Sequence, residues 1–234
     1  MKIGIFGVNN FSAGKENLID QRLDTIKNMV QSAKKIYLQV EIITDFDRLK
    51  ECDGIISIEE KKIDLILADL EFIEKRITNL GEDKEKDLLN RLKAQLEKEQ
   101  FIFELQLTEE EDKIASGYPL LSSRPVFLIS SGDSDDKSKI LALAYAYFGY
   151  ISFFTANEKE AHAWSIKKGT TCWQASGLVH SDIQKGFIRA EVIGFDDLIH
   201  DGGIHQARAN NHLRLEGKEH IVQDGDLIKF RFSK

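Results

Sequence analysis

The chain has 234 residues, enough for one large domain or two modest ones, each with its own hydrophobic core. Hydrophobic residues make up 42% and charged residues 30%, as in an ordinary soluble globular protein, and no apolar run approaches the roughly 20 residues that a membrane-spanning helix needs. The net charge of −7 excludes a general attraction to nucleic acid. Contact with RNA would need a local basic patch, and nothing signals DNA binding.

The cysteines and the first residues bear on the compartment. Only two cysteines occur, Cys52 and Cys172, without a CxxC pair, which favours a reducing compartment and argues against a disulfide framework or a zinc site. The opening MKIGIFG predicts a buried strand and not a charged-then-apolar leader. We therefore expect a cytoplasmic protein.

The balance of basic and acidic residues changes near residue 150. Residues 151–234 carry 11 basic and 11 acidic side chains, so the whole excess of negative charge falls in residues 1–150. All six histidines also lie in the second part. This shift in composition predicts two domains, 1–150 and 151–234.

Strands and helices alternate in the first part. Apolar or β-branched runs predict strands at residues 3–6, 36–44, 54–58 and 125–130. Stretches between and after them predict helices at residues 20–33, 47–52 and 140–148. Thr108, with Glu111 three residues later, fits a capping box that opens a further helix. The alternation implies an α/β domain with a parallel sheet.

The clearest periodicity predicts a helical hairpin inserted at about residues 61–106. Steps of three and four residues give its first helix a coiled-coil seam of Ile63, Ile66, Leu70, Ile73, Ile77 and Leu80. Gly81 is expected to end this helix, and the second helix, at residues 84–99, has a stripe of Leu88, Leu89, Leu92 and Leu96. Helices joined by so short a break should pack antiparallel. The hairpin could be purely structural, reach a large partner or drive self-association, so the oligomeric state stays open.

The loop after the first strand resembles a phosphate-binding loop with altered spacing. In GxxxxGK[ST], four residues separate the glycines, the Lys reaches the phosphates and the hydroxyl ligates magnesium. Here six residues separate Gly7 from Gly14, Lys15 follows, and Glu16 replaces the hydroxyl residue. Its carboxylate would repel phosphate oxygens about 4 Å away by ~4 kcal/mol at an effective dielectric near 20. Gly7, Asn9, Gly14 and Lys15 are therefore candidates for a vestigial nucleotide site.

Two further nucleotide contacts are missing. After the strand at 125–130, an Asn with a nearby acid would read a purine, but Ser131 and Ser134 stand in this loop. No DxxG follows the strand at 36–44. We assign no catalytic residue and expect no cofactor; ATP or GTP with magnesium would bind only if the altered loop still works.

The C-terminal part predicts a small α+β domain. Strands are expected at residues 161–166, 185–193 and 227–232, with a turn at Asp224-Gly225 and a helix that carries Ala175. Four residues form a polar, partly basic patch: His180, Asp182, Lys185 and Arg189. This patch is either a capped helix followed by a solvated strand face or a contact site for RNA or protein. The histidine spacing fits no metal motif, so no metal site is assigned.

Longer motifs resemble a known family. FFTANEKEAHAWSIKKGTT, QASGLVHSDIQKGFIRAEVI, FDDLI and LRLEGKEHIVQDGDLIKFRF resemble the C-terminal region of the Obg-related ATPases of the YchF type. In that family the region is a TGS domain, a ubiquitin-like β-grasp. Weaker matches upstream are QRLDTIKNMV, RLKECDGIISI and IDLILADLEFIEKRI. The resemblance covers most of the chain in a shortened form, without the helix after the phosphate loop, the switch I segment and the DxxG.

The resemblance implies a fold and two functional hypotheses. The fold is a reduced parallel P-loop-like sheet interrupted by the antiparallel hairpin, followed by the β-grasp. The family implies ATP or GTP hydrolysis, a cytoplasmic location and association with ribosomes, but Glu16, Ser131 and Ser134 put hydrolysis in doubt. The first hypothesis is a non-catalytic binding or regulatory protein that engages a ribosome, RNA or protein partner through its TGS domain and hairpin. The alternative is a nucleoside triphosphatase with an atypical loop, in which Lys15 still holds phosphate.

Overall fold

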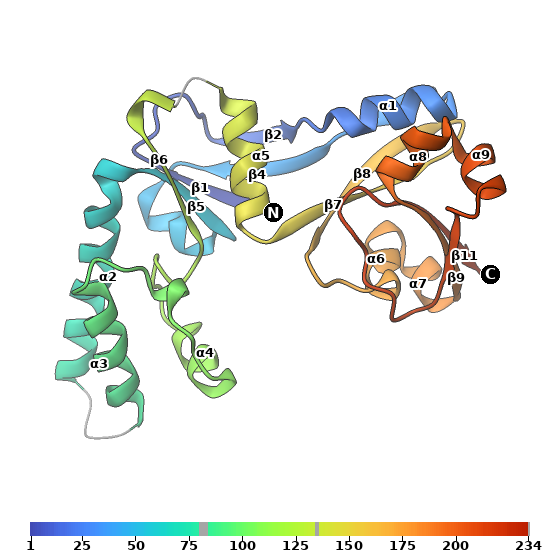
Figure 1. The fold of residues 1–234 in the computed structure, drawn as a ribbon. Coiled ribbons are helices and arrows are strands. Elements are labelled where there is room, and N and C mark those ends of the chain that lie inside the picture. Colours follow the sequence, from blue (N-terminus) through green and yellow to red (C-terminus); the bar gives the residue numbers. More distant parts are fainter. Residues whose placement is uncertain (80–83, 134–135, 234) are drawn as a thin grey trace. The chain divides into compact units, whose positions relative to one another are not determined.

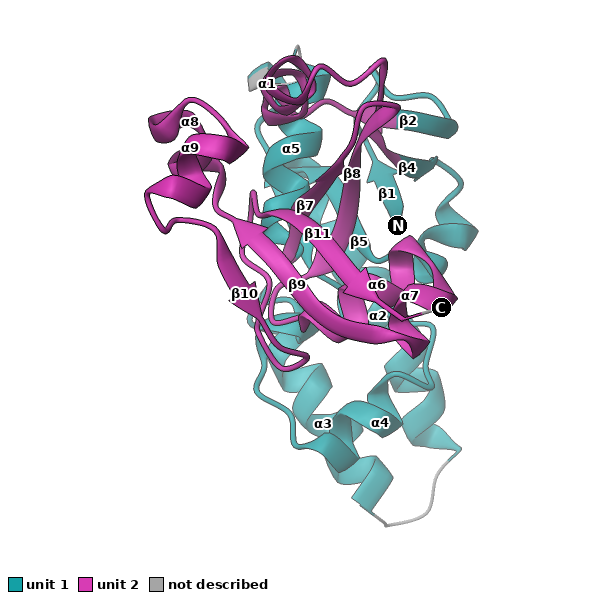
Figure 2. Ribbon diagram, turned by 90° about the vertical axis from the view of Figure 1, so that its right-hand side faces the viewer, with its two compact units in different colours: residues 1–16, 40–148 teal, residues 17–39, 149–234 magenta. Residues whose placement is uncertain are grey.

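The computed structural model describes residues 1–79, 84–133 and 136–233, which fall into two compact units (Figures 1 and 2). Unit 1 consists of residues 1–16 and 40–148, and unit 2 of residues 17–39 and 149–234. The units therefore differ from the two contiguous domains predicted above in one segment, residues 17–39, which is part of unit 2. The chain passes between the units three times.

Unit 1 is built on a five-stranded sheet in the order β2-β4-β1-β5-β6. Its strands are β1 Lys2–Phe6, β2 Gly14–Leu18, β4 Leu38–Ile43, β5 Gly54–Ile58 and β6 Val126–Ile129. β1 pairs in parallel with β4 and β5, and β5 pairs in parallel with β6. The predicted parallel pairing is confirmed. Ile3, Ile55 and Ile56 are almost fully buried, as expected for strands covered on both faces.

The helical elements of unit 1 follow local sequence signals. They are η1 Phe46–Glu51, η2 Glu59–Lys61, α2 Lys62–Thr78, α3 Lys84–Leu96, η3 Ile102–Glu104, α4 Glu109–Ala115, η4 Ser131–Asp133 and α5 Lys137–Tyr147. The capping box of Thr108 and Glu111 is confirmed at the start of α4. The helix predicted at 140–148 begins at Lys137, because the Asp136 side chain accepts a hydrogen bond from the Lys139 N–H and caps it.

The hairpin of α2 and α3 is antiparallel, as predicted. Lys93 pairs with Glu74 at 2.8 Å and Arg76 with Glu85 at 2.7 Å, so residues later in α3 face residues earlier in α2. All four leucines of the α3 stripe are buried.

The seam predicted for α2 is only partly correct. Ile66 and Ile73 are buried, but Ile63 is 38% exposed, whereas Leu65 and Asp69 are buried. The buried face is wider than a coiled-coil seam because α2 also packs in one core with residues from the segments around 101 and 121. The predicted Leu80 and the helix end at Gly81 lie outside the described residues.

Unit 2 contains a mixed six-stranded sheet in the order β10-β9-β11-β7-β8-β3. Its strands are β3 Lys34–Ile36, β7 Tyr150–Ala156, β8 Glu160–Lys167, β9 Phe187–Ile193, β10 Arg214–Glu216 and β11 Leu227–Phe232. β11 pairs in parallel with β7 and antiparallel with β9. The helices are α1 Gln21–Val30, α6 Cys172–Val179, α7 Ser181–Lys185, α8 Phe195–Asp201 and α9 Ile204–Ala209. Phe153, Ala175 and Ile228 belong to the core of this unit. The predicted α+β composition of this part is confirmed.

The prediction of a single strand at residues 36–44 is wrong. β3 ends at Ile36, β4 begins at Leu38, and the two strands belong to different sheets. β-branched composition predicts strand conformation, but it does not tell which sheet a strand joins.

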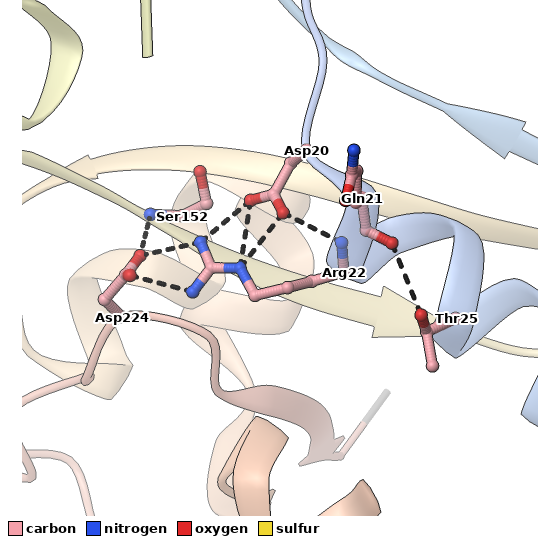
Figure 3. A network of polar contacts seen from close by, with 6 residues as sticks. All are labelled: Asp20, Gln21, Arg22, Thr25, Ser152 and Asp224. Atoms are coloured by element: carbon pink, nitrogen blue, oxygen red, sulfur yellow. Dashed lines mark hydrogen bonds and ion pairs between the residues drawn. The ribbon is translucent and has the colours of Figure 1, made fainter. Parts of the chain in front are cut away.

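A polar clamp holds α1 on unit 2 (Figure 3). The guanidinium of Arg22 donates to Asp224 at 2.8 and 3.1 Å and to Asp20 at 2.8 to 3.2 Å. Asp20 also caps α1, and Asp224 accepts from the Ser152 N–H of β7 at 3.0 Å. The guanidinium lies 5.5 Å from the centre of the Phe154 ring, within cation–π range. This network explains why residues 17–39 belong to the C-terminal unit.

Candidate functional site

The loop that resembles a phosphate-binding loop starts in close contact with neighbouring elements. Gly7 has φ of 74°, a left-handed conformation that favours glycine. A Cβ atom there would lie 2.7 Å from Lys61 Cγ and 3.0 Å from Ile58 Cγ1. Within the loop, the side chains of Val8 and Phe11 are buried, while that of Asn9 is exposed. Gly7 is therefore required by packing whether or not the loop binds an anion.

The loop ends in a strand. Gly14, with φ of 135°, opens β2, which lies beside β4 in the sheet. Lys15 is therefore an exposed strand residue. The next helix, α1, begins only at Gln21 and is capped by Asp20. A phosphate-binding loop relies on a helix that starts directly after it, because the free N–H groups and the dipole of that helix hold the anion.

Glu16 has a structural partner. Its carboxylate forms an ion pair with Lys137, the first residue of α5. The Lys137 ammonium also lies 5.3 Å from the centre of the Phe11 ring. The acidic residue that replaces the magnesium-binding hydroxyl thus joins β2 to α5, although the two residues are 121 positions apart.

The loop after β6 is also engaged in other contacts. The Ser131 hydroxyl donates to Glu60 at 3.0 Å, and Ser134 lies outside the described residues. A cavity of about 490 Å³ opens beside this loop, with Glu59, Asp136 and Lys139 among its lining residues. None of the four candidate nucleotide residues lines this cavity.

The four residues of the predicted C-terminal patch do not all lie at one site. His180, Asp182 and Lys185 line one open cavity of about 830 Å³ together with Phe232. His180 is the N-cap of α7, since its Nδ1 accepts from the Asp182 N–H at 3.1 Å. Arg189 lies on β9 and is not among the lining residues of that cavity.

Arg189 instead belongs to a cationic surface. It lies directly opposite Arg231 in the antiparallel pair of β9 and β11, and Lys229 lies opposite Glu191. Glu191 is only 6% exposed and accepts from Arg231, while Arg208 of α9 approaches it to 3.5 Å. Sequence reasoning missed the three further cations. Alternation within LIKFRF and FIRAEV could have placed Lys229, Arg231 and Arg189 on one face.

The cysteines are unsuited to nucleophilic chemistry. Both are buried free thiols, and burial raises the pKa of Cys52 to about 11 and that of Cys172 to about 12. Within residues 1–79, 84–133 and 136–233, no three His, Cys, Asp or Glu side chains are grouped so that they could hold a metal ion. Across the same residues, no helix has the length and apolar character to cross a membrane.

Comparison with known proteins agrees with the resemblance seen in the sequence. Residues 150–233 match the family model YchF-GTPase_C, described as a protein of unknown function (DUF933). The ribosome-binding ATPase YchF of Bacillus subtilis (strain 168) is 30% identical over 246 residues, covering 77% of this chain and 67% of that protein. The chain belongs to the YchF-type family of Obg-related proteins. The ribosome-binding ATPase YchF of Mycoplasma genitalium is 30% identical over 241 residues, covering 97% of this chain and 65% of that protein.

The chain spans about two thirds of the length of the relatives that it matches, 65% to 67% for the two named above. The region aligned with the Bacillus subtilis relative is longer than the whole chain yet uses 77% of it, so that relative has residues between the matched segments which this chain lacks. The solved structure of the Schizosaccharomyces pombe YchF GTPase matches with a TM-score of 0.78 at 16% identity, over 99% of this chain and 97% of that chain. This match concerns the fold.

Proposed function

We propose that this YchF-family chain is a ribosome-binding protein that does not hydrolyse nucleoside triphosphates. The observation that carries the proposal is that the loop after β1 leads into strand β2 and not into a helix. The relatives named ribosome-binding ATPase YchF support the ribosome as the partner. A ribosomal partner implies the cytoplasm as the location.

The local chemistry supports the loss of nucleotide turnover. β2 is the edge strand of its sheet, so N–H groups on one side of it face β4 and those on the other side point away from the sheet. They are spaced along an extended chain and do not converge on one phosphate as the free N–H groups at the start of a helix do. Glu16 brings a carboxylate to the position where magnesium would need a hydroxyl, and its ion pair with Lys137 fixes it there. The negative charge of this carboxylate would repel the phosphate oxygens of a triphosphate.

The C-terminal unit supports partner binding. Its mixed sheet, with β11 between β9 and β7, is consistent with the TGS-type β-grasp expected from the family resemblance. The hairpin of α2 and α3 is a second candidate contact, because charged side chains such as Lys75, Lys84 and Glu71 cover its exposed surface.

One observation favours the alternative function of ATP or GTP binding with magnesium. Lys15 is exposed and, within the part of the chain that the structure describes, has no ion-pair partner. Its ammonium is therefore free to meet a phosphate. The relatives are also named as ATPases.

Sedimentation with purified ribosomes tests the proposal. The full chain should pellet with ribosomes through a sucrose cushion, and adding ATP or GTP with magnesium should change the bound fraction by less than about twofold, since a ligand that does not bind cannot shift the equilibrium. Lys15→Ala should pellet like the original chain. Failure to pellet, or pelleting that requires a nucleotide and is lost in Lys15→Ala, would contradict the proposal.

A further inference from the structure

The outer face of β9 and β11 carries a block of three cations and one anion. Arg189 lies opposite Arg231, and Lys229 lies opposite Glu191. Residues two apart on a strand share a face, so these four side chains point to the same side of the sheet. Opposite Cβ atoms in such pairs are about 4.5–5.5 Å apart. Arg208, from α9, adds a fourth positive charge beside Glu191.

Only one of these cations is held closely by the anion. Glu191 is buried and accepts a hydrogen bond from Arg231, with Arg208 further away at 3.5 Å. In residues 1–79, 84–133 and 136–233, neither Arg189 nor Lys229 has an ion-pair partner, and both side chains are exposed. The surface therefore carries a local excess of positive charge, although residues 151–234 as a whole are neutral.

This arrangement is unfavourable for the isolated protein. Like charges directly opposite each other on neighbouring strands destabilise a sheet, and Arg189 faces Arg231 in this way. An anion bound between the two guanidinium groups would remove that repulsion. The buried Glu191 meanwhile orients Arg231, so that part of the site is arranged before a ligand arrives.

We propose that this face, made of Arg189, Arg208, Lys229 and Arg231, binds the phosphate backbone of RNA. The proposal rests on the ribosome binding proposed above and names the surface and the chemical group that it contacts. Three of the four cations are arginines, whose planar guanidinium can donate two parallel hydrogen bonds to a phosphate. No base-reading group is required, since phosphate contacts position RNA without selecting its sequence.

Binding of a labelled RNA tests the proposal directly. The probe is a fluorescein-labelled single-stranded RNA of 20 nucleotides, titrated with the full chain and followed by fluorescence anisotropy at several salt concentrations. Arg189→Gln combined with Lys229→Gln should weaken binding at least about tenfold at low salt. The slope of log K against log salt should fall by about 1.4, because each lost single-strand phosphate contact removes about 0.7. Arg231 is left intact because it pairs with the buried Glu191.

A matched control removes the same charge elsewhere in unit 2. Lys159→Gln with Lys168→Gln changes two exposed lysines next to β8, three strands away from β9 in the sheet order. This variant should bind RNA within about twofold of the original chain. The Arg189→Gln change relieves the repulsion with Arg231, so the melting temperature of the test variant should not fall. Loss of binding in a stably folded variant would then report the surface itself.

Ribosome sedimentation of the same variants separates this proposal from the one on which it rests. If the test variant binds the labelled RNA as the original chain does, the surface assignment is wrong even if ribosome binding persists. If the original chain binds ribosomes but not the protein-free RNA, and the test variant loses ribosomes, the surface contacts a ribosomal protein and the RNA assignment is overturned. If the original chain binds the RNA through this surface but does not sediment with ribosomes, only the ribosome proposal fails.

Discussion

Arg22 fixes the segment of residues 17–39 to the C-terminal unit. Replacing it by Ala removes the hydrogen bonds to Asp20 and Asp224 and leaves both carboxylates without their shared cation. We expect Arg22→Ala to lower the free energy of unfolding by about 1–2 kcal/mol, because Asp224 is half exposed and water recovers part of the loss. Denaturant titration measures this. Arg22→Lys keeps the charge but cannot donate to both carboxylates in the same geometry, so its free energy of unfolding should lie between those of the original chain and Arg22→Ala. If Arg22→Ala had the same free energy of unfolding as the original chain, the clamp would be ruled out.

His212 and Asp201 make the α8–α9 region sensitive to pH. Hydrogen bonds from Asn210 and then His212 lower the pKa of Asp201, and the bond to Asp201 raises the pKa of His212 above its ordinary value of 6.5. A raised His pKa gives stability that is fully present below the unfolded pKa and is lost as the pH rises through the folded pKa.

The melting temperature of a His212 variant, measured at two pH values, tests this coupling. His212→Gln should lower the melting temperature more at pH 6 than at pH 8.5, because the contribution of the imidazolium to stability is lost as the pH rises through the raised pKa of His212. Subtracting the melting temperature of the original chain at each pH cancels the contributions of other titrating groups. One such group is His162, whose pKa is lowered by burial. An equal effect of His212→Gln at both pH values would contradict the assignment.

Among the elements, α2 depends on a single buried carboxylate. Asp69 is 2% exposed and accepts three hydrogen bonds of 2.6–2.7 Å, from the Leu121 N–H and from the N–H and hydroxyl of Ser122. Asp69→Ala leaves these donors buried and unpaired, so we expect a loss of about 3–5 kcal/mol. Asp69→Asn retains one acceptor oxygen and should cost less. Urea titration decides, and a loss below about 1 kcal/mol for Asp69→Ala would show that water replaces the carboxylate.

Local signals in the sequence predicted elements well, and long-range contacts less well. The capping box at Thr108 and the leucine stripe of α3 depend on residues three or four apart, and both are confirmed. The width of the buried face of α2 depends on segments far along the chain. The prediction that Ile63 belongs to a buried seam is therefore wrong. Likewise the pattern at 36–44 predicted strand conformation but not the change of sheet within it.

In the candidate sites, too, the local features could be predicted from the sequence and the long-range contacts could not. The altered spacing from Gly7 to Gly14 is visible in the sequence, whereas the strand that follows it and the ion pair of Glu16 with Lys137 are not. Lys137 is 121 residues away, and no periodicity links the two. Of the predicted C-terminal patch, Arg189 lies on a surface apart from the cavity of the other three members, because α7 and β9 direct them differently.

Unit 2 is not a contiguous stretch of chain. The family model covers residues 150–233, yet α1 and β3 also belong to this unit. Leu23 and Ile26 of α1 are fully buried, and each contributes roughly 1.5–3 kcal/mol by burial. A fragment of residues 149–234 should therefore melt at a lower temperature than the full chain.

Tryptophan fluorescence follows this unit alone, because both tryptophans, Trp164 and Trp173, lie in it. The control is the same fragment supplied with residues 17–39 through a flexible linker, which should recover part of the lost stability. A fragment of 149–234 that melts like the full chain would mean that α1 and β3 contribute nothing to unit 2.

A loop that leads into a strand, with Glu16 beside it, should not hold a nucleoside triphosphate. Isothermal titration calorimetry of the full chain with ATP and with GTP, each with magnesium, tests it most directly. We predict no binding tighter than about 100 µM, or about −5.5 kcal/mol. Binding tighter than this by either nucleotide, abolished by Lys15→Ala, would contradict the account.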